Sequence, residues 1–167
     1  MATTTGITVD EFLNARFGGY EPEFAHGEII ERKMPNLLHG WIQGLLFTRL
    51  LAAGFPVIGV RMRVAADVIR LPDVALFRGS LPENQVPSDP PLVVVEIVSP
   101  DDPYPVLFAK LEDYRAWGVP NIWIVEPTLK KFQIYRDGSL TQVRQFELPE
   151  SNFRIDATTL FAEPTSR

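Results

Sequence analysis

The sequence predicts an α/β fold in which a mixed β-sheet is flanked by helices. Three observations predict this fold: helical and strand-like segments alternate along the chain, one apolar run suits a central strand covered on both faces, and a helix follows that run before the next strand. The strand–helix–strand unit at residues 92–126 indicates one parallel crossover. With 167 residues, 46% of them apolar, we expect a single domain over residues 1–167 with its core at about 20–147.

The first third of the chain is predicted to contain two helices and a hairpin. Thr8 and Glu11 have the spacing of a capping box, which marks the start of a short helix. Gly27 separates two strand-like stretches, and Gly54 follows a longer segment whose apolar residues recur at helical spacing. The predicted elements are a helix from Thr8 to about Arg16, a hairpin of residues 21–24 and 28–32, and a helix from Asn36 to about Ala53.

The rest of the chain is predicted to supply most of the sheet. Short stretches rich in β-branched residues indicate strands, and the loop at 79–91 contains four prolines. Gly118 ends a helix, and Asp137-Gly138 is typical of a hairpin turn. The predicted elements are strands at 56–65, 71–77 and 92–99, a helix from Pro103 to about Trp117, a strand at 121–126, and a hairpin of residues 131–135 and 140–146.

The composition excludes several kinds of site. The chain has no cysteine, so a cysteine-ligated zinc site, a thiol nucleophile and a disulfide framework are excluded. Only His26 and His39 are present, which disfavours an all-histidine metal site. The net charge of −5 argues against a protein that coats nucleic acid or an anionic membrane through a basic face. Any chemistry must therefore come from carboxylates, lysines, hydroxyls or the backbone.

The sequence shows no feature of a membrane or secreted protein. Residues 1–6 lack the basic and apolar regions of a secretory signal, and the longest apolar runs are far shorter than a membrane span. We therefore expect a soluble cytoplasmic protein with no membrane partner.

Three polar residues lie where a purely structural explanation fits poorly. Glu96 interrupts an apolar run, where burial of an unpaired ionised carboxylate would be costly. Asp73 opens the preceding strand, and consecutive strands tend to be neighbours. Lys110 falls within the apolar stripe of the next helix. Each has a structural alternative: a buried ion pair for Glu96, a strand-entry turn for Asp73, and an ammonium that reaches solvent for Lys110.

Together these three residues predict a site for a hard cation with an ammonium beside it. Mg²⁺ or Mn²⁺ accepts oxygen ligands from carboxylates, and Mg²⁺ keeps several waters and binds substrate phosphate oxygens. The metal would lower the pKa of a bound water, while Lys110 would orient that water or offset charge developing on phosphorus. Phosphodiester hydrolysis is the reaction class that this set suits best.

An ordered set of residues over about Tyr20 to Tyr135 also carries a family resemblance. The set comprises Pro72-Asp73, residues 94–100, Lys110, Tyr114, Gly118-Val119, Trp123 and Glu126-Pro127, with Gly27-Glu28 and His39 upstream. It resembles the Uma-type restriction endonuclease family within the PD-(D/E)XK nuclease superfamily. The resemblance implies a restriction-endonuclease-like fold and divalent-metal-dependent cleavage of DNA.

The resemblance also implies roles for particular residues. Asp73 and Glu96, with the backbone carbonyl of Ile97, would hold Mg²⁺ or Mn²⁺, and Lys110 would be the catalytic lysine. The standard motif of the superfamily places the lysine two residues after the acid, where this chain has Val98. The lysine is therefore expected to act from the following helix.

Four further residues are secondary candidates. Glu28 matches a family position and is either an additional catalytic ligand of metal or water, or an exposed acid after a turn glycine. His39 is expected to pack or cap the long helix, and it is left out of the catalytic set. Arg61 and Arg63 alternate onto one strand face, where they either contact phosphates or line a solvated surface.

Other functions stay open at this point. The chain could be a catalytically inactive nuclease-fold module that binds nucleic acid or protein, with Glu96 and Lys110 as a buried ion pair. It could also hydrolyse another phosphate ester at the same metal site. A homodimer is expected because cleavage of a duplex needs two cuts and the helix at 36–53 is rich in apolar residues.

Overall fold

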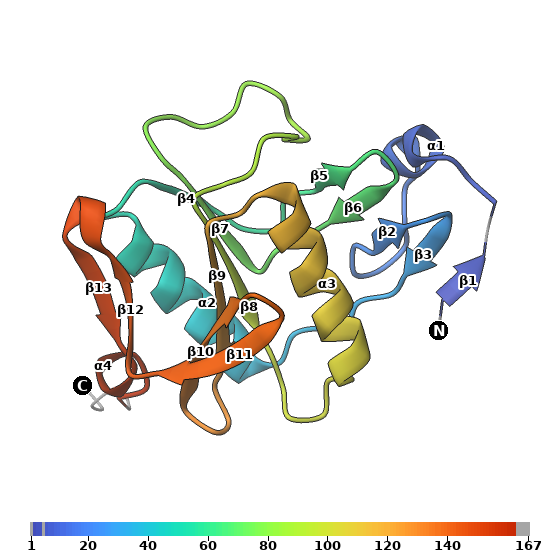
Figure 1. Cartoon of the computed structure of the whole chain (residues 1–167). Helices are drawn as coiled ribbons and strands as arrows, with labels where there is room; N and C mark the ends of the chain where they lie inside the picture. The colour runs from blue at the N-terminus through green and yellow to red at the C-terminus, as the bar shows by residue number, and fades with distance from the viewer. Residues whose placement is uncertain (1, 5, 163–167) are drawn as a thin grey trace.

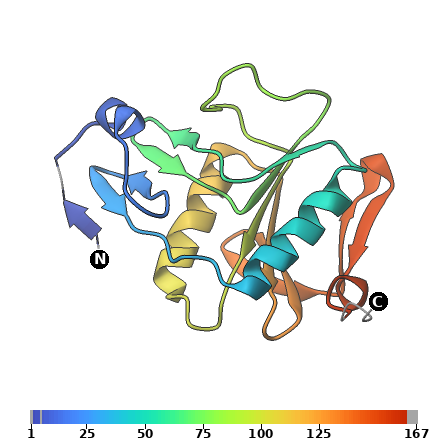
Figure 2. The same cartoon turned by 180° about the vertical axis from the view of Figure 1, so that it is seen from behind.

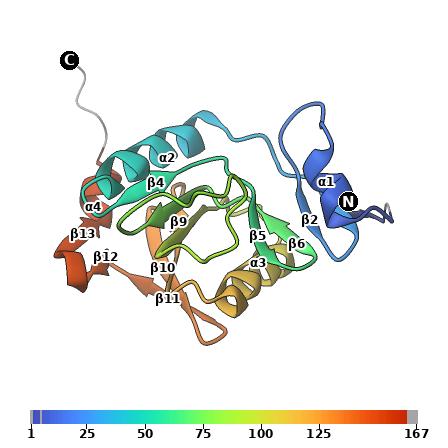
Figure 3. The same cartoon turned by 90° about the horizontal axis from the view of Figure 1, so that it is seen from above.

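A computed structural model describes residues 2–4 and 6–162, and its centre is a six-stranded sheet between two long helices (Figure 1). Helix α2 (Leu37–Leu50) covers one face and α3 (Tyr104–Trp117) covers the other, as the view from above shows (Figure 3). From edge to edge the strands are β11 (Ser139–Val143), β10 (Lys131–Arg136), β9 (Asn121–Glu126), β8 (Val93–Ile97), β7 (Val74–Phe77) and β4 (Phe55–Val57). The predicted mixed sheet with flanking helices is confirmed.

The strand register places the two candidate acids side by side. β8 and β9 pair in parallel through the α3 crossover, and the other neighbours in this sheet pair antiparallel. Val74 on β7 lies opposite Val95 on β8. Continuing that register by one residue places Asp73 directly opposite Glu96, where facing side chains lie close together.

Alternation along the strands divides the core into two layers. Val95 faces α2, where it joins the cluster formed with Ile42 and Leu46. Val94 faces α3, where it joins the cluster formed with Leu111 and Tyr114. Glu96 is two residues after Val94 and therefore faces the same side of the sheet. Its carboxylate thus lies in the apolar layer beneath α3.

A second sheet lies on the other side of α3, at the right of Figure 1. Its strands in spatial order are β1 (Ala2–Thr4), β3 (Glu28–Ile30), β2 (Glu23–Ala25), β6 (Val68–Arg70) and β5 (Met62–Ala65). Helix α1 (Val9–Asn14) covers this sheet, and Phe12 packs with Phe24 in a small separate core. Met62 and Val68 contribute to the core around α3. Helix α3 is therefore held between two sheets.

The C-terminal part adds a small hairpin that packs on the α2 side. It consists of β12 (Gln145–Leu148), a 3₁₀ turn (Pro149–Ser151), β13 (Phe153–Asp156) and α4 (Ala157–Leu160). Phe146 is sandwiched between Trp123 and Phe132, with ring centroids 4.5 and 4.2 Å away. This aromatic stack joins the hairpin to the central sheet.

Most helix ends agree with the sequence signals. Thr8 and Glu11 form the predicted capping box of α1, and α3 ends at Gly118 with φ +102°, a left-handed conformation that suits glycine. Asn36 caps α2 by accepting a hydrogen bond from the His39 backbone N–H. Across residues 2–4 and 6–162, no helix has the length and apolar character needed to cross a membrane.

Three strand predictions are wrong in detail. The stretch 56–65 is not one strand, because β4 pairs in the central sheet whereas β5 pairs in the second sheet, with a bend at Gly59 where φ is +68°. The predicted strand at 71–77 begins at Val74, and β6 just before it was missed. The predicted strand at 140–146 is divided between β11 and β12. In the first and third cases, tertiary pairing divides a stretch whose local composition is uniform.

Candidate active site

Glu96 lies at the end of β8 and is held by two side chains of α3. The Lys110 ammonium lies 2.9 Å from Oε2, and the Tyr114 hydroxyl donates a hydrogen bond of 2.7 Å to Oε1. Lys110 and Tyr114 are four residues apart, so they project from the same face of the helix. Glu96 is only 5% exposed. The carboxylate that interrupts the apolar run is therefore buried and has partners on both oxygens.

Asp73 is buried beside Glu96, just before β7 begins. Its Oδ2 accepts a hydrogen bond of 2.8 Å from the backbone N–H of Ile97. On Oδ1 lie Arg32 Nη2, at 3.4 Å, and His39 Nε2, at 3.3 Å. Gln43 on α2 donates to the Asp73 carbonyl at 2.7 Å. The structure thus brings Asp73, Glu96 and the Ile97 backbone together at one end of the β7–β8 pair.

A third buried acid, Glu23, completes the cluster from the second sheet. Its Oε1 lies 2.8 Å from Lys110 Nζ and accepts a hydrogen bond of 2.8 Å from the backbone N–H of Leu71. Lys110 also donates to the Leu71 carbonyl at 3.3 Å. A single ammonium on α3 therefore joins Glu23 of one sheet to Glu96 of the other.

Sequence reasoning missed Glu23. Its segment also contains Glu21 and Glu28, and nothing local separates the three acids. What distinguishes Glu23 is the pairing of β2 with β6, which brings it to the backbone of Leu71. A non-local pairing of this kind leaves no periodic signal in the sequence.

Arg70 fixes Glu23 from the side opposite Lys110. Its guanidinium lies 3.1 Å from Glu23 Oε2 and donates two hydrogen bonds, of 2.9 and 2.6 Å, to one carboxylate oxygen of Asp113 on α3. Arg70 is 4% exposed. Because arginine presents several N–H donors in a fixed fork, it can hold both acids at once and tie β6 to α3.

Replacing Arg70 with alanine should lower the free energy of unfolding by about 3 kcal/mol, since the buried Glu23 would lose one of its two cationic partners and Asp113 would lose its own. Urea denaturation followed by circular dichroism measures the change. Arg154→Ala serves as the control, because Arg154 is exposed and its loss should change stability by less than about 0.5 kcal/mol. Equal effects of the two substitutions would show that the Arg70 network does not stabilise the fold.

The charged groups of the cluster shift one another's pKa values. Burial, aided by Asp73 and Glu23 and opposed by Lys110, raises the pKa of Glu96 to about 7. Burial also tends to raise the pKa of Glu23 and of Asp73, but Lys110 and their hydrogen bonds hold both below their usual ranges. For Lys110, burial alone would lower the pKa, but Glu23 and Glu96 raise it above its ordinary value. Glu96 is therefore the acid whose ionisation would gain most from a further cation.

The donor set fits a hard divalent cation that is only partly coordinated by protein. Across residues 2–4 and 6–162, no group of three or more histidines and acids is arranged to hold a metal ion. Mg²⁺, however, is commonly bound by one or two carboxylates and completes its octahedral shell with waters and substrate phosphate. Asp73 and Glu96, with the Ile97 carbonyl at the same strand end, match that requirement.

Residues 9–159 match the family model Uma2, described as "Putative restriction endonuclease". The chain belongs to this family. One matching solved structure is described as that of "a putative nuclease belonging to DUF820 from Anabaena variabilis ATCC 29413". It superposes with a TM-score of 0.79 at 20% sequence identity, covering 93% of this chain and 97% of that one. A search of curated proteins found no match.

These comparisons confirm the predicted family and the α/β restriction-endonuclease-like fold. The family description supports a nuclease function in general terms. The Uma2 match includes Glu23, Asp73, Glu96 and Lys110, so the whole buried cluster lies within the matched region. The cluster is therefore the candidate active site of this Uma2 chain.

Two of the secondary candidates lie close to the cluster. Glu28 is on β3, opposite Ala25, and strand alternation places it on the same face of the second sheet as Glu23. Glu23 of the same hairpin contacts Lys110. The ring of His39 lies against Asp73, so His39 belongs to the surroundings of a candidate acid even though the sequence prediction left it out. Its buried Nδ1 has no hydrogen-bond partner among the described residues.

The two strand arginines have a structural role. Arg61 donates to the Leu13 carbonyl, forms an ion pair with Glu21, and lies over the Phe12 ring. Arg63 forms an ion pair of 3.0 Å with Asp10. Both arginines therefore link the second sheet to α1 and its flanking loops. The alternative that Arg61 lines a purely solvated surface is wrong.

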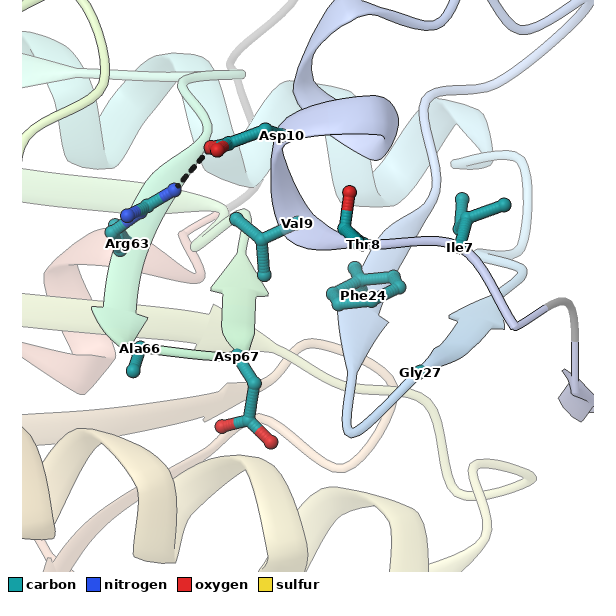
Figure 4. A pocket seen from close by; sticks show the side chains of 9 residues that line it. All are labelled: Ile7, Thr8, Val9, Asp10, Phe24, Gly27, Arg63, Ala66 and Asp67. Carbon is teal, nitrogen blue, oxygen red and sulfur yellow. Dashed lines mark hydrogen bonds and ion pairs between the residues drawn. The ribbon is translucent and has the colours of Figure 1, made fainter.

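A pocket of about 360 Å³ lies beside α1, and none of the residues that line it belongs to the acidic cluster (Figure 4). It is lined by Ile7, Thr8, Val9, Asp10, Phe24, Gly27, Arg63, Ala66 and Asp67. Its charged groups already have partners, because Arg63 pairs with Asp10, and Asp67 Oδ2 lies 2.7 Å from His26. The buried cluster, where several charges converge, is therefore the better candidate for chemistry.

Proposed function

We propose that this Uma2-family chain is a divalent-metal-dependent endonuclease that hydrolyses DNA phosphodiester bonds at Asp73, Glu96 and Lys110. The observation that carries the proposal is a lysine 2.9 Å from a buried glutamate, with an aspartate opposite that glutamate in the strand register. Lys110 joins two buried acids, Glu23 and Glu96, and Asp73 lies opposite Glu96, which is the kind of set that a site binding a cation and a phosphate needs. The family description supports a nucleic-acid substrate.

Asp73, Glu96 and the Ile97 carbonyl would hold Mg²⁺ or Mn²⁺. When bound, the ion would polarise the scissile phosphate and lower the pKa of a coordinated water. Asp73 is preorganised for this role because the Ile97 N–H and Gln43 fix its side chain and its backbone. Arg32 and His39, which lie on Oδ1 of Asp73, would help to neutralise an incoming phosphate.

Lys110 would act from α3 as a positioned donor. Glu23 and the Leu71 carbonyl hold its ammonium next to Glu96. From there Lys110 would orient the attacking water in line with the leaving oxygen and offset negative charge as it develops on phosphorus. Water adds to phosphorus and gives up a proton to solvent, the P–O bond to the leaving nucleotide breaks, and the leaving oxygen takes up a proton from solvent.

Incubation of circular supercoiled DNA with the purified protein tests the proposal. With Mn²⁺ the protein should produce nicked and linear DNA, EDTA should stop the reaction, and excess Mn²⁺ should restore it. Asp73→Asn protein purified in parallel controls for a contaminating nuclease. The proposal fails if wild-type protein with Mn²⁺ cleaves no DNA or if cleavage continues unchanged in EDTA. Hydrolysis of a small phosphodiester without DNA cleavage would instead indicate another phosphate-ester substrate.

One observation favours a second candidate, an inactive nuclease-fold module. Both carboxylate oxygens of Glu96 are already bonded within the protein, to Lys110 and Tyr114. In such a module the cluster would serve only as a buried ion-pair network that links the two sheets through α3. Thermal unfolding distinguishes the candidates, because added Mn²⁺ should raise the melting temperature of an active nuclease and leave that of an inactive module unchanged.

We also infer that two copies of the chain act together. A duplex has two antiparallel strands, and a pair of sites related by a twofold axis matches that symmetry. Micromolar protein that sediments only as a monomer would contradict this.

A further inference from the structure

The Lys110 ammonium is surrounded by oxygen atoms in the way that a bound cation would be. Its Nζ lies 2.8 Å from Glu23 Oε1, 2.9 Å from Glu96 Oε2 and 3.3 Å from the Leu71 carbonyl oxygen. These three oxygens match the three N–H donors of an ammonium. Carboxylate and carbonyl oxygens are also the ligands that hard divalent cations take in proteins. The ammonium therefore occupies a position that would otherwise suit a second cation.

The three oxygens come from separate segments that meet beside α3. Glu23 is on β2 of the second sheet, Glu96 is on β8 of the central sheet, and Leu71 directly follows β6. Figure 2 shows α3 (yellow) between the second sheet (blue and green) and the central sheet. The Lys110 side chain is only 12% exposed, so water screens its charge little. The ammonium is thus a fixed positive charge between the two sheets.

Glu23 is held on this ammonium by its other partners. Its Oε1 also accepts a hydrogen bond of 2.8 Å from the Leu71 N–H, and its Oε2 lies 3.1 Å from Arg70 Nη1. Glu23 is 3% exposed, and Arg70 is itself fixed by Asp113. A carboxylate with partners on both oxygens is not free to turn towards another cation. Glu23 therefore acts as the counter-ion of Lys110.

Glu96 differs from Glu23 because it faces two places at once. It contacts Lys110 on one side, and the strand register places it opposite Asp73 on the other. A divalent ion between Asp73 and Glu96 could weaken the contact of Glu96 with the ammonium. Lys110 would still keep its contacts with Glu23 and Leu71. The lysine can therefore stay in place when such an ion binds.

A second divalent ion would meet this ammonium. To bridge Glu23 and Glu96 the ion would have to take the position of Lys110 Nζ or lie beside it, where like charges repel with little screening. In enzymes with two metal ions, the ions lie about 3.5–4 Å apart and stabilise the attacking and leaving oxygens together. In this chain the ammonium already supplies a positive charge next to the first cation position.

We propose that each site holds one divalent ion, and that the Lys110 ammonium, anchored by Glu23, takes the place of a second. This inference rests on the proposed metal site at Asp73 and Glu96 and adds its stoichiometry. It makes Glu23 a positioning residue, which acts on the reaction only through the lysine. Removing the ammonium should then create a second metal position between Glu23 and Glu96.

Equilibrium dialysis against saturating Mn²⁺, followed by metal analysis, counts the ions bound to each folded chain. Wild-type protein should bind one ion, and Lys110→Met should bind two. The double variant Lys110→Met/Glu23→Gln should bind one again, because one acid of the second position is then neutral. The matched control is Lys33→Met, which removes an exposed lysine paired with Asp102 and should bind one ion.

The possible counts separate this inference from the proposed function. Two ions in wild-type protein would overturn the inference and leave the metal site of the proposed nuclease standing. No ion in wild-type protein would refute that metal site, and the inference with it. One ion in Lys110→Met, two in the double variant, or two in Lys33→Met would also overturn the inference. The wild-type count can refute it alone, so the test does not depend on the folding of Lys110→Met.

Thermal unfolding gives a readout that does not depend on counting ions. Mn²⁺ should raise the melting temperature of Lys110→Met by more than that of wild-type protein, because a second ion binds only the folded variant. It would replace the positive charge that Glu23 and Glu96 have lost. The double variant Lys110→Met/Glu23→Gln should lose this extra shift. Equal shifts for Lys110→Met and wild-type protein would contradict the inference.

Anomalous diffraction from crystals soaked in Mn²⁺ locates the ions. Wild-type crystals should show one peak, beside Asp73 and Glu96. Lys110→Met crystals should show a second peak within coordination distance of Glu23 and Glu96, where the ammonium lies in the wild-type chain. A second peak at any other position in Lys110→Met, or a peak between Glu23 and Glu96 in wild-type crystals, would overturn the inference.

Discussion

Replacing Glu96 with glutamine should lower the rate of Mn²⁺-supported DNA cleavage by about 1,000-fold, the upper range for loss of one preorganised electrostatic group. The amide keeps the size of the side chain and can still accept a hydrogen bond from Tyr114. It removes the charge that would coordinate the cation. Lys110 keeps its ion pair with Glu23, so the fold should survive the substitution. Initial rates of plasmid nicking measure the effect.

The matched control is Glu112→Gln on the same helix. Glu112 is a partly exposed acid that bonds to Arg115 and Tyr135, and it does not contact the buried cluster. The Glu112 variant should cleave DNA at the wild-type rate. If Glu96→Gln also cleaved at that rate while remaining folded, Glu96 would not take part in the chemistry.

Replacing Lys110 with methionine should lower the free energy of unfolding by about 3–5 kcal/mol in metal-free protein. Methionine keeps most of the side-chain volume but leaves Glu23 and Glu96 buried without the ammonium that lies 2.8 and 2.9 Å from them. The double variant Lys110→Met/Glu96→Gln should recover part of this loss, because one of the two carboxylates is then neutral. Urea denaturation of the single and double variants measures both effects.

The surface pair of Lys33 with Asp102 provides the control for Lys110. Lys33 is largely exposed, so Lys33→Met should change stability by no more than about 1 kcal/mol. A Lys110→Met protein as stable as wild type would mean that Glu23 and Glu96 do not depend on the ammonium. The ion-pair network described for α3 would then be wrong.

The core of the candidate site was predictable because two of its members violate a local pattern. A carboxylate inside an apolar strand and a lysine within an apolar helical stripe are visible anomalies, and the structure brings Glu96 and Lys110 into contact. Asp73 was predictable from the tendency of consecutive strands to pair, and its register opposite Glu96 agrees with that expectation.

The remaining parts of the site depend on contacts between distant segments. Glu23 and Arg70 have ordinary sequence surroundings, and they meet only because β2 pairs with β6. His39 belongs to the residue set that resembles the family, but no local pattern indicates its contact with Asp73, because that contact depends on how α2 is rotated against the sheet. Gly59 illustrates the same limit for the fold, because the bend there moves a uniform stretch from one sheet to the other.

Direct measurement of Mn²⁺ binding tests the central claim, that Asp73 and Glu96 together hold a divalent cation. Electron paramagnetic resonance of free Mn²⁺, titrated with protein in the absence of DNA, reports the bound fraction. The wild-type chain should show saturable binding, and both Asp73→Asn and Glu96→Gln should lose it while remaining folded. Glu112→Gln should bind as wild type does. No saturable binding by the wild-type chain, or equal binding by the Asp73 and Glu96 variants, would contradict the claim.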